Sequence, residues 1–380
     1  AAGGDQELHG GMPPPPPRYC SPIGHYPGPS DQLATLRRVV PALGASRAAR
    51  IAAAAALAAL GVFHAVGLTR GAPLQDFGAY LRGAWGVVHR GDPYDTRNPG
   101  ALLPFIYPPF AAMVLAPLSL LPRRGAELAM TVSSLGCLWY LVDLVARRAW
   151  PRAGWSRSWG VGAATLVALA TEPVWATLGL GQINLVLAAL VATDLLRLRD
   201  TRWAGVLIGV AAGIKITPAF FVLHLLAAGR PRDAARAAAT AAGTVLVAGA
   251  VMPRPSWRYW AGGDFLFSLS EVGKAANQSL SGAWVRLADD ESVTRWPWLV
   301  VALGVAIVGL ASSGRLDRDG RAADALVVAA VTQLLVAPTS WTHYWVWTVP
   351  AAVVLAARFR ERPWPAAALA RVPVVPALMG

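Results

Sequence analysis

The stretch Gln75-Asp76-Phe77-Gly78-Ala79-Tyr80 decides the fold, because it follows directly after an apolar run, 48–68, that is long enough to cross a bilayer. A second apolar run begins at about 104. The segment between the two runs continues through Gly91-Asp92-Pro93-Tyr94 to Phe105-Ile106-Tyr107-Pro108-Pro109-Phe110. We therefore expect Asp76 to lie at a membrane surface.

Residues after Asp76 repeat at helical spacing, which predicts a helix lying along that surface. One of its faces is apolar and the other carries basic side chains. The apolar face contains Phe77, Tyr80, Leu81, Ala84, Trp85 and Val88, and the other face contains Arg82, His89 and Arg90.

The whole composition indicates an all-α polytopic membrane protein, since 55% of the 380 residues are hydrophobic and 14% are charged. The net charge of +13 comes largely from arginines that cluster between apolar runs, as the positive-inside rule expects, so we expect no nucleic-acid partner. We predict roughly 10–12 transmembrane or re-entrant helices. The further apolar runs are 104–121, 126–146, 158–176, 180–197, 203–228, 234–252, 297–313, 322–338 and 341–357.

Basic residues also set the orientation. Arginines at 37–50 precede the first run, which places the N-terminus in the cytoplasm and Asp76 on the extracytoplasmic side of the cytoplasmic membrane. The Pro- and Gly-rich residues 1–45 are expected to form a disordered cytoplasmic tail. A membrane domain would occupy 46–358, with outer loops at 69–103 and 253–296, and a cytoplasmic tail would occupy 359–380.

The middle of the chain admits two topologies. Simple alternation gives ten crossings but puts the arginines at 147–157 and 197–202 outside. If 203–228 instead turns back near Lys215 as two short helices, these arginines become cytoplasmic, and 104–146 contains an odd number of crossings with a break near Pro117 or Pro122. We favour the second topology because it brings Gln182, Asn184 and Lys215 to the same face as Asp76.

Several polar residues interrupt the apolar segments. Gln182 and Asn184 either cap and bridge helices or bind hydroxyl-rich ligands. Lys215 costs roughly 2.5–3.5 kcal/mol in hydrocarbon unless it snorkels, faces a wet cavity or pairs with an anion such as phosphate. Asp92 lies in Gly91-Asp92-Pro93-Tyr94, which has the composition of a turn.

Two segments near the predicted outer face carry further candidates. Asn277, Gln278 and Arg286 lie in the predicted outer loop 253–296, and Ser340 and His343 join two apolar runs. His343 is either an interfacial residue or a donor to a phosphate oxygen. The rings of Trp257, Tyr259, Trp260 and Trp284 either stack on sugars or anchor the chain at the interface.

Motifs for other chemistries are missing from the sequence. It has no Walker-type loop, no dinucleotide fingerprint, no His-Glu-x-x-His pattern and no Cys/His cluster. We therefore expect no cofactor and assign no metal ligands.

Taken together, seven motifs resemble the actinobacterial polyprenol-phosphate-mannose-dependent α-(1→2)-mannosyltransferases, glycosyltransferase family 87, over about 48–357. Each motif alone is degenerate, but their order and spacing are specific. The motifs are Asp76-Phe77-x-x-Tyr80, Gly91-Asp92-Pro93-Tyr94, Tyr107-Pro108-Pro109-Phe110, Gly181-Gln182-x-Asn184, Lys215-x-x-Pro218, Asn277-Gln278-Ser279-Leu280 with Arg286, and Ser340-Trp341-x-His343. Tyr344 stands where many relatives would carry a second His.

The resemblance implies a GT-C membrane fold, a polyprenyl-phosphate-mannose donor and a glycolipid or lipoglycan acceptor. It implies that Asp76 is the general base, which agrees with the chemistry of an inverting transfer. Lys215, Arg286 and His343 would bind the donor phosphate. The residues implied for sugar and acceptor binding are Tyr80, Asp92, Tyr107, Gln182, Asn184, Asn277, Gln278 and Ser340.

Two other functions fit the same residues. An arabinofuranosyltransferase that uses decaprenylphosphoryl arabinose would share the fold, the base and the donor phosphate. A lipid-linked sugar flippase or transporter would use Lys215 and the interrupted helices as a substrate site.

Overall fold

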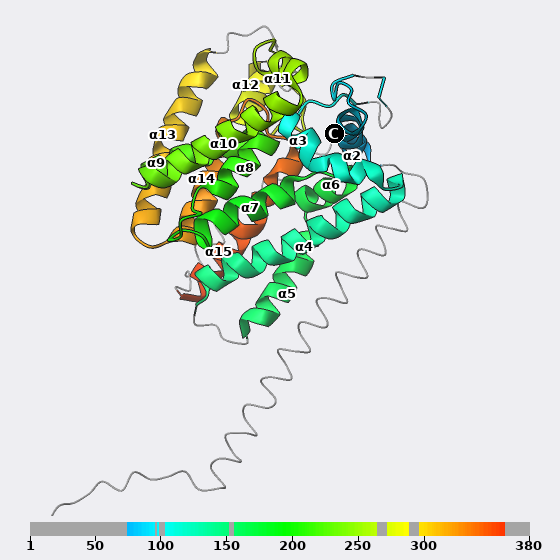
Figure 1. Ribbon diagram of the computed structural model, residues 1–380. Coiled ribbons are helices and arrows are strands. Elements are labelled where there is room, and N and C mark those ends of the chain that lie inside the picture. Colours follow the sequence, from blue (N-terminus) through cyan, green and yellow to red (C-terminus); the bar gives the residue numbers. More distant parts are fainter. Residues whose placement is uncertain are drawn as a thin grey trace, which may run out of the picture. The chain divides into compact units, whose positions relative to one another are not determined.

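Helices account for the regular structure of the computed structural model, which describes residues 74–95, 97–98, 103–151, 156–263, 272–288 and 296–361 (Figure 1). No β-strand occurs in these ranges, so the predicted all-α class is confirmed. The predicted run 48–68 and tail 1–45 lie outside the described residues, as does 362–380 of the predicted C-terminal tail. The helices are α2 (Gln75–Val88), α3 (Pro109–Leu115), η1 (Ala116–Leu120), α4 (Arg123–Ala149), α5 (Ser156–Leu169), α6 (Glu172–Leu180), α7 (Asn184–Leu196), α8 (Val206–Ile214), η2 (Thr217–Ala219), α9 (Phe220–Ala227), α10 (Pro231–Val251), α11 (Pro253–Trp260), α12 (Leu280–Ala288), α13 (Trp296–Arg318), α14 (Ala322–Val336), η4 (Thr342–Trp347) and α15 (Thr348–Glu361).

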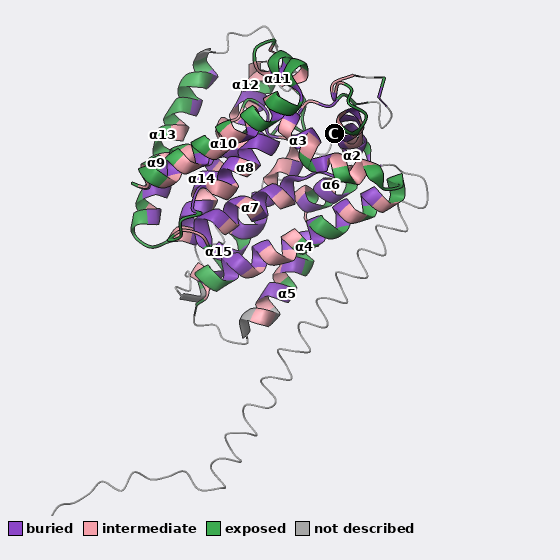
Figure 2. Cartoon of the chain, viewed as in Figure 1, coloured by how far each residue is buried: buried purple, intermediate pink, exposed green. Residues whose placement is uncertain are grey.

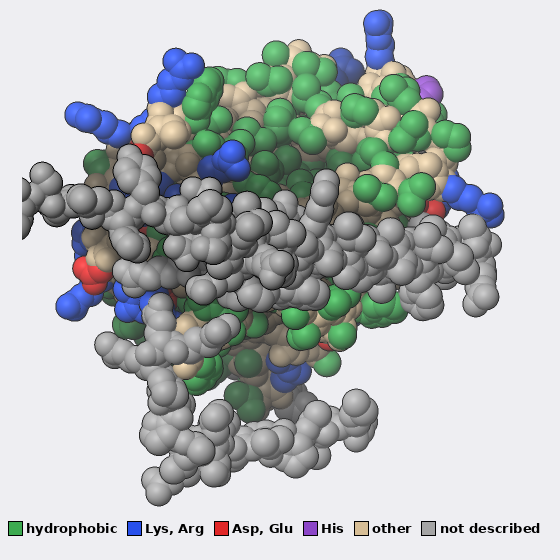
Figure 3. Space-filling view, turned by 90° about the horizontal axis from the view of Figure 1, so that it is seen from below, with side chains coloured by type: hydrophobic (Ala, Val, Ile, Leu, Met, Phe, Trp, Pro, Cys, Tyr) green, Lys and Arg blue, Asp and Glu red, His purple; other side chains and the backbone are tan. Residues whose placement is uncertain are grey.

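Three described helices, α4, α10 and α13, are long and apolar enough to cross a membrane. The pair α5 and α6 would make a fourth span if counted as one, although it bends by 66°. Burial is concentrated on α7 and α8, whereas α13 is largely exposed (Figure 2). The exposed side chains of α13 include Val300, Leu303 and Val308, which are suited to contact lipid. In the view of Figure 3, hydrophobic side chains make up much of the coloured surface, and several Lys and Arg side chains project at its edges.

The predicted surface helix is present as α2, but its two faces differ from the prediction. Arg82 was expected on a solvated face and is instead buried, with 6% of its surface exposed, whereas Val88 is exposed. The physical reason is that the following loop folds back over the helix: Phe105 packs at Gly83, and Pro93 packs at Gly86. One side of α2 is therefore covered by the segment that follows it.

The apolar run 203–228 is broken at Lys215, which has an extended backbone between α8 and η2. α8 runs in the same direction as α10, because Gly205 lies against Asp233 and Gly213 lies against Thr244. α9, which follows α8 in the chain, runs in the opposite direction, since Arg230 after α9 donates a hydrogen bond to the carbonyl of Arg199 before α8 (3.1 Å). The prediction that this run turns back as two short helices is confirmed.

The returning hairpin gathers the basic junctions at one end of the helices. Arg236 donates to the carbonyl of Arg202 (2.8 Å), and Arg199 pairs with Asp317 near the end of α13. Arg148 at the end of α4 donates to the carbonyl of Leu196. This arrangement supports the second topology, in which α4 is the helix of 104–146 that is long enough to cross.

Candidate functional site

A tight turn between α6 and α7 positions the amides of the candidate site. Gly181 ends α6 with φ of 70°, and a Cβ added there would lie 2.6 Å from Cβ of Phe77 on α2. Only glycine tolerates both the left-handed backbone and this close approach. Gln182 is thereby held against α2, and Asn184 begins α7.

Gln182 joins the carboxylate of Asp76 to a buried tyrosine. Its Nε2 donates to Oδ2 of Asp76 (2.6 Å), and its Oε1 accepts from the hydroxyl of Tyr80 (2.7 Å). Tyr80 is almost fully buried, and its ring lies 4.8 Å from that of Tyr107. The amide is therefore fixed in orientation, and it leaves the second oxygen of Asp76 for another partner.

Burial raises the pKa of the Asp76 carboxyl above its usual value, while the hydrogen bond from Gln182 and the charge of Lys215 act in the opposite direction. Asp76 lies in the first turn of α2, where the helix dipole also favours the ionised form. The result is a half-buried carboxylate with a raised affinity for protons, which is the property required of a general base.

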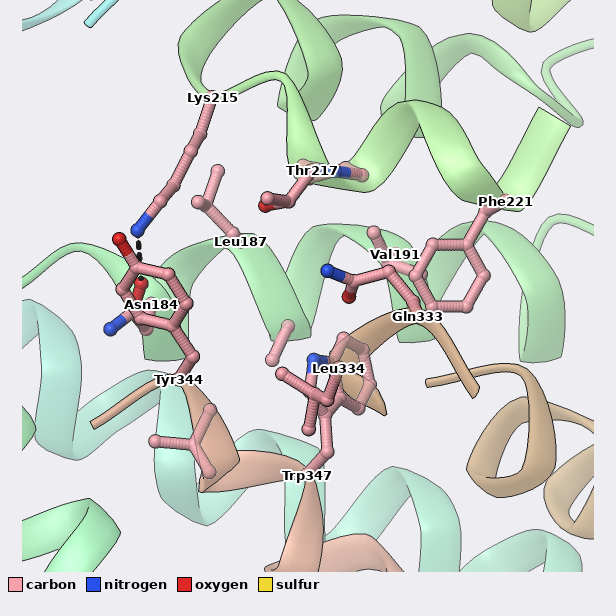
Figure 4. Close-up of a pocket in the computed structure, with 13 residues that line it drawn as sticks. Asn184, Leu187, Val191, Lys215, Thr217, Phe221, Gln333, Leu334, Tyr344 and Trp347 are labelled. Atoms are coloured by element: carbon pink, nitrogen blue, oxygen red, sulfur yellow. Dashed lines mark hydrogen bonds between the residues drawn. The ribbon is translucent and has the colours of Figure 1, made fainter. Parts of the chain in front are cut away.

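Lys215 lies at the break between α8 and η2 and points toward α7 (Figure 4). Its Nζ donates to Oδ1 of Asn184 (3.0 Å) and lies 3.7 Å from the centroid of the Tyr344 ring and 5.6 Å from that of Tyr107. In the described part of the chain, no carboxylate lies within 4 Å of this ammonium. An amide and two aromatic faces surround this side chain and no carboxylate pairs with it, so the site is suited to an anion.

His343 is held in place through its backbone. Its carbonyl accepts hydrogen bonds from Oγ1 of Thr177 (2.8 Å) and Nδ2 of Asn184 (2.9 Å). Its ring is buried, and Nε2 has no hydrogen-bond partner among the described residues. Asn184 thus connects Lys215 to the η4 segment that carries His343 and Tyr344.

A small cavity of about 30 Å³ lies beside Lys215 and is lined by Asn184, Thr217, Gln333 and Tyr344, among others (Figure 4). It has room for about one or two water molecules. Gln333 was not singled out from the sequence, because a single amide in an otherwise apolar helix carries no spacing signal.

Two loops are joined by hydrogen bonds between Asn277 in one and Ser340 in the other. Oδ1 of Asn277 accepts from the backbone N–H of Ser340 (2.8 Å), and an isolated antiparallel bridge links Asn277 to Trp341. Arg286 donates to the carbonyl of Asn277 (2.8 Å), and Gln278 is exposed. These residues position the loop that leads into His343, and their predicted binding roles stay predictions.

Asp92 occupies the turn that its sequence indicates. Its Oδ1 accepts from the N–H of Tyr94 (2.9 Å), and its Oδ2 pairs with Arg258 (2.7 Å). The carbonyl of Asp92 lies at Gly86, which places it about 15 Å along α2 from Asp76. A binding role for Asp92 stays a prediction.

Two further side chains were not found from the sequence. Thr177, which holds the His343 carbonyl, looks like any threonine of an apolar helix. Tyr344, noted only as a departure from the family pattern, supplies the aromatic face closest to Lys215. Within the described ranges, no three or more His, Cys, Asp or Glu side chains gather in a way that suits a metal ion.

Fold and site together define a helical integral membrane protein with a half-buried carboxylate and a buried ammonium linked through one short turn. The chain belongs to glycosyltransferase family 87, whose family model matches residues 105–338. The predicted family and membrane fold class are thus confirmed.

Characterised relatives carry names of one kind. The chain is 35% identical over 274 residues to the polyprenol-phosphate-mannose-dependent alpha-(1-2)-phosphatidylinositol mannoside mannosyltransferase of Mycobacterium tuberculosis, covering 67% of this chain and 62% of the relative. It is 35% identical to the Mycolicibacterium smegmatis protein of that name, covering 68% and 62%. It is 34% identical to a pentamannoside mannosyltransferase of M. tuberculosis, covering 77% and 69%. No solved structure matches the chain.

Proposed function

We propose that this protein transfers mannose from polyprenyl-phosphate mannose to a phosphatidylinositol mannoside or a related glycolipid, forming an α-(1→2) linkage. The observation that carries the proposal is the turn Gly181–Asn184, which links the candidate base Asp76 to Lys215 through two amides. The names of the relatives supply the donor, the acceptor and the linkage.

In the proposed reaction, an acceptor hydroxyl attacks C1 of mannose while Asp76 takes its proton. The bond between C1 and the phosphate oxygen breaks on the opposite face, and its electron pair stays on the departing polyprenyl phosphate. A β-linked donor would then give an α product. Gln182 holds one carboxylate oxygen, which aims the other at the acceptor.

The departing phosphate gains negative charge, and the ammonium of Lys215 is the group best suited to stabilise it. Nε2 of His343, which has no partner among the described residues, is a second group in the same region. Arg286 bonds to two backbone carbonyls, so its contribution would be to support the loop or to reorient when the donor binds.

We also propose that the site lies on the extracytoplasmic side of the membrane. The supporting observation is that the basic junctions gather at one end of the helices. Positive residues are favoured on the cytoplasmic side, and the arginines at 199–202 and 230–236 would lie there.

A membrane assay with labelled polyprenyl-phosphate mannose, labelled decaprenylphosphoryl arabinose and phosphatidylinositol mannoside acceptors tests this function. We expect mannose transfer by the wild type and a loss of about 10²–10⁴-fold in Asp76→Asn, because an amide cannot accept the proton. Asp95→Asn is the matched control, since Asp95 lies in the segment that follows α2 and pairs with Arg97 instead (2.7 Å).

Transfer of arabinose but not mannose would replace the proposal by the arabinofuranosyltransferase. Donor translocation without transfer, retained in Asp76→Asn, would indicate a flippase. The four relatives, all named for mannose, favour the first outcome.

A further inference from the structure

Gln333 lies near the end of α14 and points into the small cavity beside Lys215 (Figure 4). The residue is buried, with 6% of its surface exposed. Within the described part of the chain, its side-chain amide forms no hydrogen bond. A buried amide is costly unless it finds a hydrogen-bond partner, so we look for that partner in the cavity that the amide faces.

The residue before it on α14 shows how a polar side chain is accommodated without the cavity. Oγ1 of Thr332 donates to the carbonyl of Val328 one turn earlier (2.7 Å), and the side chain packs against α13 at Gly309. Thr332 lies outside the lining of the cavity. Two adjacent polar residues of α14 thus differ: one is satisfied within its own helix, and Gln333 is directed toward the candidate site.

The ammonium of Lys215, which lines the same cavity, has more donors than the surrounding side chains accept. It carries three N–H groups. Oδ1 of Asn184 accepts one of them (3.0 Å), and the face of the Tyr344 ring lies 3.7 Å from Nζ. In the described ranges, Asn184 supplies the one hydrogen-bond acceptor of this ammonium. A buried ammonium is stabilised when its remaining N–H groups reach water or an anion.

Size and polarity make the cavity suitable for water. Its volume of about 30 Å³ corresponds to about one or two water molecules, and a buried water typically needs about two to four polar partners. Lys215, Thr217 and Gln333 all line the cavity. In the view of Figure 4, Thr217 lies between the other two. Water in this cavity would therefore meet polar groups from both of its sides.

We propose that Gln333 is a positioning residue for Lys215 and acts through water that it holds in this cavity together with Thr217. The water accepts a hydrogen bond from the ammonium and keeps it in place for the phosphate of the lipid-linked donor. The inference rests on the proposed function for the role of Lys215 as the phosphate contact. It does not depend on which sugar is transferred.

The dissociation constant of decaprenyl phosphate, measured on the purified full chain, tests this link without requiring sugar transfer. Gln333→Met keeps the length of the side chain but removes its hydrogen bonds. We expect this variant to bind decaprenyl phosphate about three- to tenfold more weakly, the effect of losing about one hydrogen bond. Gln333→Asn should bind nearly as well as the wild type, because its shorter amide still reaches water in the cavity.

Two double variants separate an effect through Lys215 from a general effect on packing. In a Lys215→Met background, Gln333→Met should cause no further loss, because the group that it positions is missing. Thr217→Val/Gln333→Met should bind little more weakly than either single variant, because both side chains act on the same water. Thr332→Val is the matched control on α14 and should bind as the wild type does. Thermal unfolding in detergent reports whether each variant is folded.

Three results would overturn the link between Gln333 and Lys215. They are wild-type affinity in Gln333→Met, an equal loss in Thr332→Val, and a loss that persists in the Lys215→Met background. Failure of the proposed function has a different signature. A wild type that binds decaprenyl phosphate but transfers no mannose would contradict the mannosyl transfer, while the pattern of the variants would still support the link.

Discussion

At the scale of single residues, the environment of Asp76 determines how the proposed reaction depends on pH. A general base acts only when deprotonated, so activity falls as the pH drops through its pKa. Burial raises the pKa of Asp76 above its ordinary 3.8, so the acid limb of the rate profile should lie above that value. The hydrogen bond from Gln182 lowers this pKa and therefore opposes the effect of burial.

Replacing Gln182 by Leu should move the acid limb to higher pH. The substitution removes a donor that stabilises the charged carboxylate, so the pKa of Asp76 rises further. The measurement is kcat/KM for the donor against pH. Gln278→Leu is the control for the position of the acid limb, because Gln278 bonds to the carbonyl of Ala275 (2.6 Å) and not to Asp76, whatever its effect on the rate itself. An unchanged acid limb in Gln182→Leu would show that another group titrates.

Lys215→Met tests the proposed phosphate contact. The variant keeps the side-chain length but loses the charge, so we expect kcat/KM to fall by about 10²–10³-fold. Losing the positive charge should also raise the pKa of Asp76 and shift the acid limb upward. Lys274→Met serves as the comparison, since the chain has only these two lysines and Lys274 is exposed. Equal rates in both variants would rule out Lys215 as the phosphate contact.

Residue types in the sequence identified the polar members of the site but not how they pair. Gln182, Asn184 and Lys215 stand out because each interrupts an apolar run, and the structure brings all three together near Asp76. Thr177 gives no such signal. Gln333 also interrupts an apolar run, but it belongs to none of the seven motifs and was not singled out from the sequence. The loop contacts of Asn277 depend on which segments meet, which a linear pattern does not encode.

At the scale of helices, the start of α8 depends on two residues that hydropathy does not identify. Asp194 on α7 accepts hydrogen bonds from the N–H groups of Gly205 (2.6 Å) and Ile208 (2.9 Å), capping α8 from a neighbouring helix. Gly205 has φ of 96°, and a Cβ there would lie 2.2 Å from the carbonyl oxygen of Asp233. Gly205 therefore lets α8 begin against α10 and brings Lys215, one helix length later, to the site.

Gly205→Ala should destabilise the protein by more than about 1–2 kcal/mol, because alanine disfavours this backbone and its methyl group meets α10. Gly243→Ala is the matched control: it lies within α10 with open space around it, so the same change should be neutral or stabilise by about 0.5–1 kcal/mol. Thermal unfolding in detergent measures both. Similar unfolding temperatures for the two variants would contradict the close approach at Gly205.

The apolar runs of the sequence predicted the positions of the long helices more accurately than the positions of the breaks between helices. The runs 126–146, 234–252 and 297–313 each correspond to one long helix. By contrast, 158–176 spans the 66° bend between α5 and α6. Hydropathy averages over a window, whereas a bend is set by local backbone geometry and by the helix packed against it.

At the scale of the whole molecule, the polar residues of the candidate transfer site and the clustered arginines lie at opposite ends of the helices. The candidate transfer site lies where α2, the Gly181 turn and η4 meet, and the arginines lie where α4, α7 and α13 end and α10 begins. The lipid-facing surface of α13 connects these two levels. A lipid-linked donor would then be held from the leaflet opposite the clustered arginines.

Accessibility from the two sides of the membrane tests this orientation. In a background of Cys20→Ala/Cys137→Ala, cysteines are placed at His89, exposed at the end of α2, and at Arg232, exposed at the start of α10. A membrane-impermeant maleimide should label His89→Cys in intact cells, whereas Arg232→Cys should react only after permeabilisation, because positive junctions stay in the cytoplasm. Labelling of Arg232→Cys in intact cells would place Asp76 in the cytoplasm, where an extracytoplasmic acceptor cannot reach it.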